Sequence, residues 1–149
     1  MSLQNQVMDA MKVAMKEKDS MALQALRAVK SAILLAQTES GAKEELEESE
    51  EIKLLQKLVK QRKDSAAIFN EQGREDLAAP ELAEAAVIEQ FLPAQLSEEE
   101  VAKVVDAIIA ETGASSMKDM GRVMGMANQK LAGQADGKTI STIVKSRLS

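Results

Sequence analysis

The side chains of this 149-residue chain that could do chemistry are its carboxylates, its lysines and its hydroxyl groups. The chain contains no Cys, which excludes disulfides, thiolate nucleophiles and metal sites built on cysteine. It also contains no His, the commonest metal ligand and the side chain whose free pKa lies nearest neutrality. A Ser-His-Asp triad and a His-based zinc site are therefore excluded, and we expect no catalytic residue, no metal site and no cofactor.

Several glutamates lie on either side of Pro93, at helical spacing before it and in a continuous run after it. Paired carboxylates can bind metal ions or transfer protons. They are Glu81, Glu84, Glu89 and the run Glu98–Glu100. The sequence fixes no separation between their carboxylates, and no sugar-binding aromatic residues surround them. A solvated helix face explains these glutamates better than a catalytic or metal-binding pair.

The carboxyl end of the chain carries a charge opposite to that of the whole protein. Residues 117–149 contain 6 cations and 2 acids, so 6 − 2 gives +4, whereas the whole chain is −5. A small cationic segment on an acidic protein suggests an anionic partner more than a catalyst. We therefore treat all the tail cations as candidate nucleic-acid contacts. These residues are Lys118, Arg122, Lys130, Lys138, Lys145 and Arg147.

A second group of cations lies in the first part of the chain, where i, i+3 spacing places neighbouring cations on a shared helix face. These side chains are candidate secondary contacts to a nucleic acid. The alternative is ion pairing with the acidic segment at residues 40–51 and with Asp64, Asp76 and Glu81. We favour ion pairing because residues 1–96 contain 12 cations against 17 acids. The candidate secondary contacts are Arg27, Lys30, Lys60 and Arg62.

Two glycines, Gly121 and Gly125, lie four residues apart in the sequence MGRVMG, inside a predicted helix. Each glycine costs a helix about 1 kcal/mol relative to alanine, so a compensating role is expected. Their spacing on one face favours close packing against another helix of the tail. The alternative is a flat backbone surface that a nucleic-acid strand approaches closely.

The composition predicts an all-α protein, because straight-chain helix formers dominate and the only aromatic residues are Phe69 and Phe91. Apolar residues recur at steps of three and four in seven segments. The predicted helices cover about 3–18, 19–39, 49–72, 80–91, 97–112, 116–132 and 136–148, with a mobile surface loop at 40–51. Asp136 is expected to cap the last helix.

A predicted boundary follows the fourth helix, where Pro93 forbids an ordinary helical continuation. Ser97 with Glu100 then forms a capping box for the next helix. We expect an N-terminal four-helix domain at residues 1–93 and a small C-terminal three-helix domain at residues 94–149. No apolar run approaches the roughly 20 residues needed to cross a bilayer. The first residues carry charges and no signal-peptide core, so we expect a cytoplasmic protein with no membrane partner.

Several sequence blocks, in order along nearly the whole chain, resemble the GatB/YqeY family and within it the free-standing YqeY type. The resemblance implies an N-terminal helical domain and a C-terminal three-helix domain similar to the tail of the B subunit of the glutamine-dependent tRNA amidotransferase. That tail is associated with tRNA contact and not with chemistry, so the resemblance implies tRNA as a partner. The blocks are LRAVKSAI (26–33), KQRKDS (60–65), GREDL (73–77), FLPAQLSEEE (91–100), MGRVMG (120–125) and AGQADGK (132–138).

The residues and the resemblance together leave three hypotheses. The first is a tRNA-associated, non-catalytic adaptor, which would contact RNA through its backbone and shape because base-stacking aromatics are scarce. The second is an accessory component of a carbon–nitrogen ligase with glutamine as amido-N-donor, partnered by an amidotransferase or an aminoacyl-tRNA synthetase. Nothing in this chain matches the catalytic domain of the B subunit, so we expect no activity from the chain alone. The third is a protein–protein interaction module.

Overall fold

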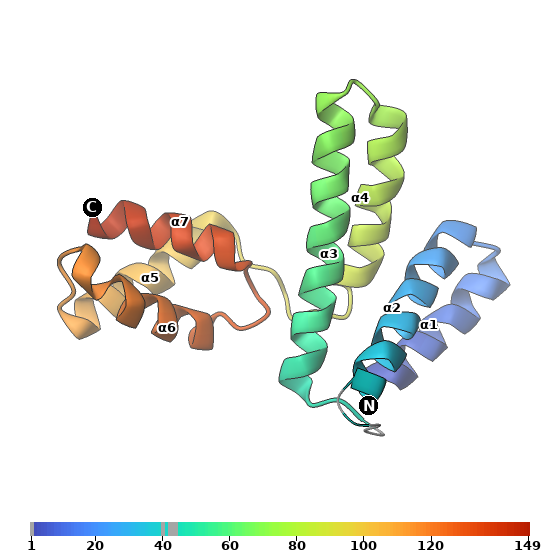
Figure 1. The fold of residues 1–149 in the computed structure, drawn as a ribbon, viewed down its shortest axis with the longest axis horizontal. Helices are drawn as coiled ribbons and strands as arrows, with labels where there is room; N and C mark the ends of the chain where they lie inside the picture. The colour runs from blue at the N-terminus through green and yellow to red at the C-terminus, as the bar shows by residue number, and fades with distance from the viewer. Residues whose placement is uncertain (1, 40, 42–44) are drawn as a thin grey trace. The chain divides into compact units, whose positions relative to one another are not determined.

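The computed structural model describes residues 2–39, 41 and 45–149, and all regular structure in these residues is helical. The predicted all-α class is therefore confirmed. None of the described helices combines the length and the apolar character that crossing a membrane requires. The helices are α1 (Leu3–Glu17), α2 (Ser20–Glu39), α3 (Glu48–Glu71), α4 (Glu75–Glu89), α5 (Glu98–Thr112), α6 (Met120–Lys130) and α7 (Gly137–Leu148), and a 3-10 turn, η1 (Met117–Asp119), precedes α6 (Figure 1).

Contacts between residues divide the chain into two compact units, Met1–Leu92 and Pro93–Ser149. Unit 1 contains α1 to α4, and unit 2 contains α5 to α7. Dense packing inside a unit does not by itself mean that the unit folds alone. The division into domains at 1–93 and 94–149 therefore stays a prediction.

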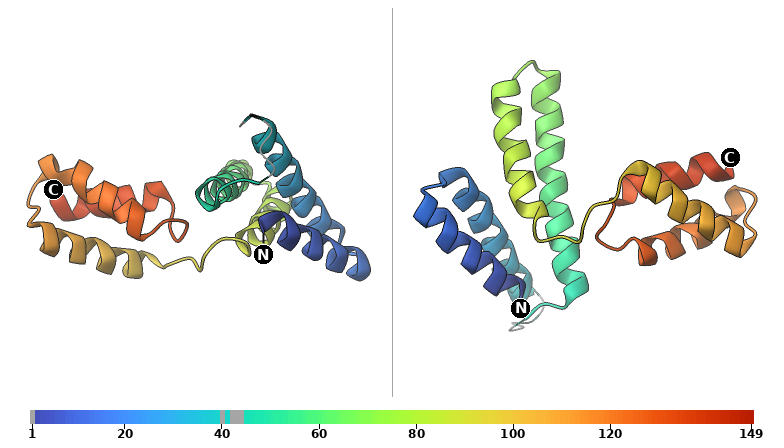
Figure 2. Two further views of the ribbon diagram at one scale, coloured as in Figure 1. Left: turned by 90° about the horizontal axis from the view of Figure 1, so that it is seen from below. Right: turned by 180° about the vertical axis from the view of Figure 1, so that it is seen from behind.

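Unit 1 is built from two helical hairpins that pack against each other. Helix α1 pairs with α2, α3 pairs with α4, and α2 packs against both α4 and α3 (Figures 1 and 2). Leu26 and Val29 of α2, Leu55 of α3 and Ile88 of α4 belong to one buried cluster and are at most 1% exposed. Because each helix repeats apolar residues at helical spacing, one side of each helix enters this core and the other side faces water.

Unit 2 is a bundle in which α5, α6 and α7 each contact the other two. Val105 of α5, Val123 of α6 and Val144 of α7 are completely buried in its aliphatic core. The segment after Pro93 is fastened to the turn between α6 and α7. There the Leu96 N–H donates to the Gln134 carbonyl over 2.9 Å.

Local sequence signals fix several helix ends as predicted. The Ser97 hydroxyl accepts from the Glu100 N–H while the Glu100 carboxylate accepts from the Ser97 N–H, which forms the predicted capping box of α5. The bond from the Ser97 N–H holds the pKa of Glu100 below its usual value, because it stabilises the ionised carboxylate. Asp136 accepts from the Thr139 N–H over 2.6 Å and so caps α7. Gly113 ends α5 with φ +69, a left-handed conformation that favours glycine.

The predicted start of α4 at Pro80 is wrong, because the helix begins at Glu75. Gly73, with φ +72, already turns the chain after α3, and Glu75 and Asp76 place negative charge at the new N-terminus. Pro80 therefore lies inside the helix, which forgoes one backbone hydrogen bond there.

The predicted surface loop at 40–51 is only partly testable. Residues 40 and 42–44 lie outside the described residues, and from Glu48 onward the segment belongs to α3.

We predict that a fragment comprising residues 93–149 folds alone, because its core is closed by its own helices. A unit of this size buries a small share of its surface, so its stability should be modest. Ile108→Ala should remove about 2–5 kcal/mol and abolish the cooperative thermal transition of the fragment, followed by circular dichroism at 222 nm, the usual helix signal. A wild-type fragment that melts without cooperativity would contradict the division into domains.

Candidate nucleic-acid interface

All the predicted tail cations lie on the surface of unit 2, but three of them are paired with acids. Arg147 Nε lies 2.8 Å from a carboxylate oxygen of Asp106, and Lys130 Nζ lies 3.5 Å from one of Glu111. Arg122 lies 3.9 Å from its near neighbour Asp119 and donates to the Thr112 carbonyl over 3.1 Å. The structure therefore neutralises half of the cations that the sequence singled out.

The charges of unit 2 are separated by helix. Helix α5 carries 5 acids and 1 cation, so 1 − 5 gives −4, whereas residues 113–149 contain 6 cations and 2 acids, which gives +4. The unit is therefore neutral in sum. Asp106 and Glu111 belong to α5, so two of the three paired cations, Lys130 and Arg147, find their partners on that helix.

The other three tail cations, Lys118, Lys138 and Lys145, make no ion pair with any described residue, and all three are exposed. Lys138 and Lys145 are seven residues apart on α7, which places them on one face of that helix. Among the predicted tail cations, these two lysines are therefore without an ion pair to any described residue and lie on the same surface of α7.

The outward face of α6 lacks side chains at two successive turns. Gly121 and Gly125 are exposed, and a Cβ built on either residue would meet no heavy atom within 4 Å. The predicted packing of these glycines against another helix of the tail is therefore wrong. Periodicity could not reveal this, because Val123 and Ala127 take the core-facing positions and leave the glycines on the opposite side. Lys118 precedes this face, and Arg122 borders it.

The N-terminus of α7 is a poor anion site. The Asp136 carboxylate already accepts from the Thr139 N–H, and its negative charge lies where a phosphate would have to bind. The AGQADGK segment thus acts as a helix cap.

The predicted secondary contacts of unit 1 fall into different environments. Arg27 and Lys30 are exposed on α2 and have no ion pair in the part of the chain that the structure describes. Lys60 pairs with Asp64 over 2.8 Å, as the ion-pairing alternative predicted. Arg62 is largely inaccessible: its side chain is 17% exposed, lies 3.9 Å from Glu84 and donates to the Leu58 carbonyl. We do not carry Arg62 forward as a nucleic-acid contact.

Three of the six glutamates with catalytic potential serve as structural partners. Glu84 is 13% exposed beside Arg62, so the predicted solvated face is wrong at this position. Glu89 lies 2.6 Å from Lys63, and Glu100 caps α5. Among the described residues, no group of three or more acids is arranged to hold a metal ion.

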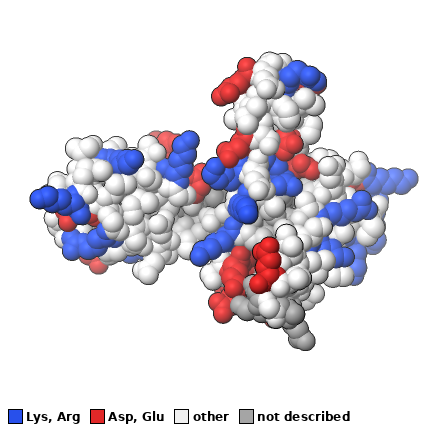
Figure 3. Space-filling model, viewed as in Figure 1, with Lys and Arg blue, Asp and Glu red and all other residues white. Residues whose placement is uncertain are grey.

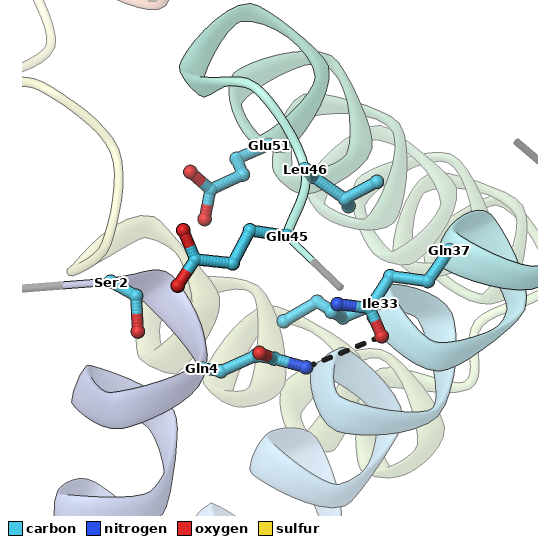
Figure 4. A pocket seen from close by; sticks show the side chains of 7 residues that line it. All are labelled: Ser2, Gln4, Ile33, Gln37, Glu45, Leu46 and Glu51. Atoms are coloured by element: carbon cyan, nitrogen blue, oxygen red, sulfur yellow. Dashed lines mark hydrogen bonds between the residues drawn. The ribbon is translucent and has the colours of Figure 1, made fainter. Parts of the chain in front are cut away.

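A cavity of about 100 Å³ in unit 1 lies beside the start of α1. Figure 4 shows Gln4 and Gln37 bridged across it, with Nε2 of Gln4 donating to Oε1 of Gln37 over 3.4 Å. Burial raises the pKa of Glu51 on its rim, and the Leu3 N–H opposes that shift. These contacts fasten α1 to α2 and α3.

Comparisons with known proteins support the sequence resemblance. The sequence profile of the family described as Yqey-like protein matches residues 4–148. A relative from Clavispora lusitaniae, "Altered inheritance of mitochondria protein 41, mitochondrial", is 33% identical over 125 residues, which cover 82% of this chain and 72% of the relative.

A second relative is a glutamyl-tRNA(Gln) amidotransferase subunit of Thermococcus gammatolerans. It is 38% identical over 84 residues, in the C-terminal part of this chain. The match covers 54% of this chain but 13% of the relative, so this chain corresponds to a small part of that much longer protein.

We predict that Gly121→Ala and Gly125→Ala each raise the free energy of unfolding by about 0.5–1 kcal/mol, because neither glycine is needed for backbone geometry or packing. Urea unfolding of the whole chain measures the change. The matched control is Gly113→Ala, which has equal space but φ +69, and should destabilise by about 1–2 kcal/mol. Destabilisation by the α6 substitutions would mean that the glycines pack after all.

Proposed function

Because the chain belongs to the family of Yqey-like proteins, we propose that it is a non-catalytic adaptor that binds tRNA through unit 2. The observation that carries the proposal is the backbone of α6 exposed at Gly121 and Gly125, bordered by cations. Glycines in an exposed helix face weaken the helix and have no packing role inside the unit, so a partner that needs close approach accounts for them.

The same geometry suggests how RNA would be held. A sugar–phosphate backbone can approach α6 closely at the glycines, and Lys118 and Arg122 lie next to it to contact phosphates. Lys138 and Lys145 supply further positive charge from α7. Contacts of this kind read backbone and shape, in agreement with a unit that contains no aromatic residue.

The paired cations of the tail remain available for phosphate binding. The Lys130–Glu111 and Arg147–Asp106 pairs are about half exposed on each side. Exposed ion pairs contribute only about 0–1 kcal/mol, so exchange of a carboxylate for a phosphate costs little. We therefore propose that Lys130 and Arg147 contact phosphates in the complex with tRNA, in addition to the lysines that have no ion pair.

The similarity to part of an amidotransferase also supports a second candidate, an accessory protein that associates with an amidotransferase or with an aminoacyl-tRNA synthetase. Such a protein would contribute no reacting group and would position tRNA for its partner. Co-purification of an amidotransferase that survives nuclease treatment, without any tRNA binding by the isolated chain, would favour this candidate over the adaptor. A cytoplasmic location stays a prediction, and the name of the Clavispora relative places that protein in mitochondria.

We predict that Lys138→Glu together with Lys145→Glu weakens binding of unfractionated tRNA in a gel shift and flattens its salt dependence. Each lost phosphate contact should reduce the slope of log affinity against log salt by roughly 0.7–0.9. The control is Lys103→Glu, the same substitution made once on α5 of the same unit, which should leave the slope unchanged. Lys138→Glu and Lys145→Glu made singly carry the same charge change as this control. No binding by the wild-type chain would end the proposal.

We also predict that Gly125→Leu weakens tRNA binding at least tenfold while the chain stays folded. Leucine is a better helix former than glycine, and the site is open, so only a partner that approaches the backbone would be obstructed. Affinity and thermal stability are measured on the same preparation. Full affinity in a stable variant would show that α6 does not contact the RNA at this point.

A further inference from the structure

In a block in the middle of α3, every charged residue is a cation. Between Ile52 and Lys63 the helix carries 5 cations and no acid. The surrounding unit is acidic, since residues 1–92 contain 12 cations and 17 acids and 12 − 17 gives −5. Arg62 belongs to this block, but its side chain lies within the α3–α4 hairpin, where the Glu84 carboxylate offsets its charge.

The remaining four cations of the block form what we call the lysine ridge: Lys53, Lys57, Lys60 and Lys63. Steps of four, three and three residues place them in a row along α3, in which Lys53 and Lys57 lie opposite to the buried Leu55 and Lys63 lies beside α4. All four are exposed. Figure 3 shows basic side chains gathered along α3 on the face in view.

The ridge is poorly neutralised by the protein itself. Lys60 pairs with Asp64 and Lys63 with Glu89, both at the surface. Lys53 and Lys57 make no ion pair with any residue in the described ranges. Like charges four residues apart on a helix repel and weakly destabilise it, so Lys53 and Lys57 add nothing to the stability of α3. A polyanionic partner would neutralise both charges.

We propose that the lysine ridge is a second phosphate-binding surface, through which unit 1 contacts the same RNA that unit 2 binds. This inference rests on the proposed function. Lysines in a row match a polyanion with regularly repeated charges. An anionic membrane fits less well, because the core-facing residues Leu55, Val59 and Ala66 of α3 are buried in unit 1. Ile68 alone among the described residues of α3 is a large apolar side chain that is mostly exposed, and one residue does not make an apolar face to insert.

The test compares the full chain with Lys53→Gln/Lys57→Gln, using unfractionated tRNA at several salt concentrations. Loss of two contacts should lower the salt slope by roughly 1.4–1.8, which corresponds to one to two orders of magnitude in affinity at 0.1 M salt. Lys53→Arg/Lys57→Arg keeps both charges and should bind like the wild type. The matched control is Lys12→Gln/Lys16→Gln, an exposed pair with the same spacing on α1, outside the ridge.

Three outcomes would overturn the inference, and they separate it from the proposed function. If the ridge variant has the same salt slope as the wild type, the ridge does not contact the RNA, while the proposed tRNA binding by unit 2 is unaffected. An equal loss in the α1 control shows that only net charge matters. Ridge-dependent binding to phosphatidylserine vesicles, with no ridge dependence for tRNA, assigns the surface to membranes. Absence of tRNA binding by the wild type instead defeats the proposed function itself.

Discussion

Burial of one aliphatic stripe on every helix is the constraint on which the remaining features of this protein depend. With almost no aromatic residues, each unit closes its core with Leu, Ile, Val and Ala side chains from all of its helices. Once Val123 and Ala127 turn inward, Gly121 and Gly125 must face outward. In the same way, burial of Leu55 and Val59 turns Lys53 and Lys57 to the opposite side of α3. The candidate binding surfaces are thus consequences of core packing.

Electrostatics act on this framework without defining it. The acids of α5 and the cations of α6 and α7 balance within unit 2, and the ion pairs between them are exposed and weak. In the free protein, fewer cations of the tail are therefore without an ion pair than a count of residues suggests. In the proposed complex, a phosphate would replace the carboxylate partner of Lys130 or Arg147. Arg62 and Glu84 behave differently, because burial fixes them as partners inside the α3–α4 hairpin.

Stability and the proposed binding role compete in α6. A small bundle has a modest free energy of unfolding, and two exposed glycines reduce it by about 2 kcal/mol relative to alanine. The glycines contribute no packing within unit 2. In the same way, Lys53 and Lys57 of α3 have no ion pair to any described residue. Both features weaken the isolated protein, and both are explained by a partner that approaches a helix backbone or neutralises a row of charges.

The sequence alone determined the helical class, most helix positions, the caps at Ser97, Gly113 and Asp136, and the family. Each of these depends on residues a few positions apart, which is the range over which helical periodicity and capping operate. Only the tertiary structure decided which cations stay free, because Asp106 and Arg147 meet across 41 residues of sequence. It also decided that Arg62 is partly buried and that the α6 glycines face solvent. A periodic pattern assigns residues to a side of their own helix, but the neighbouring helices decide whether that side meets protein or water.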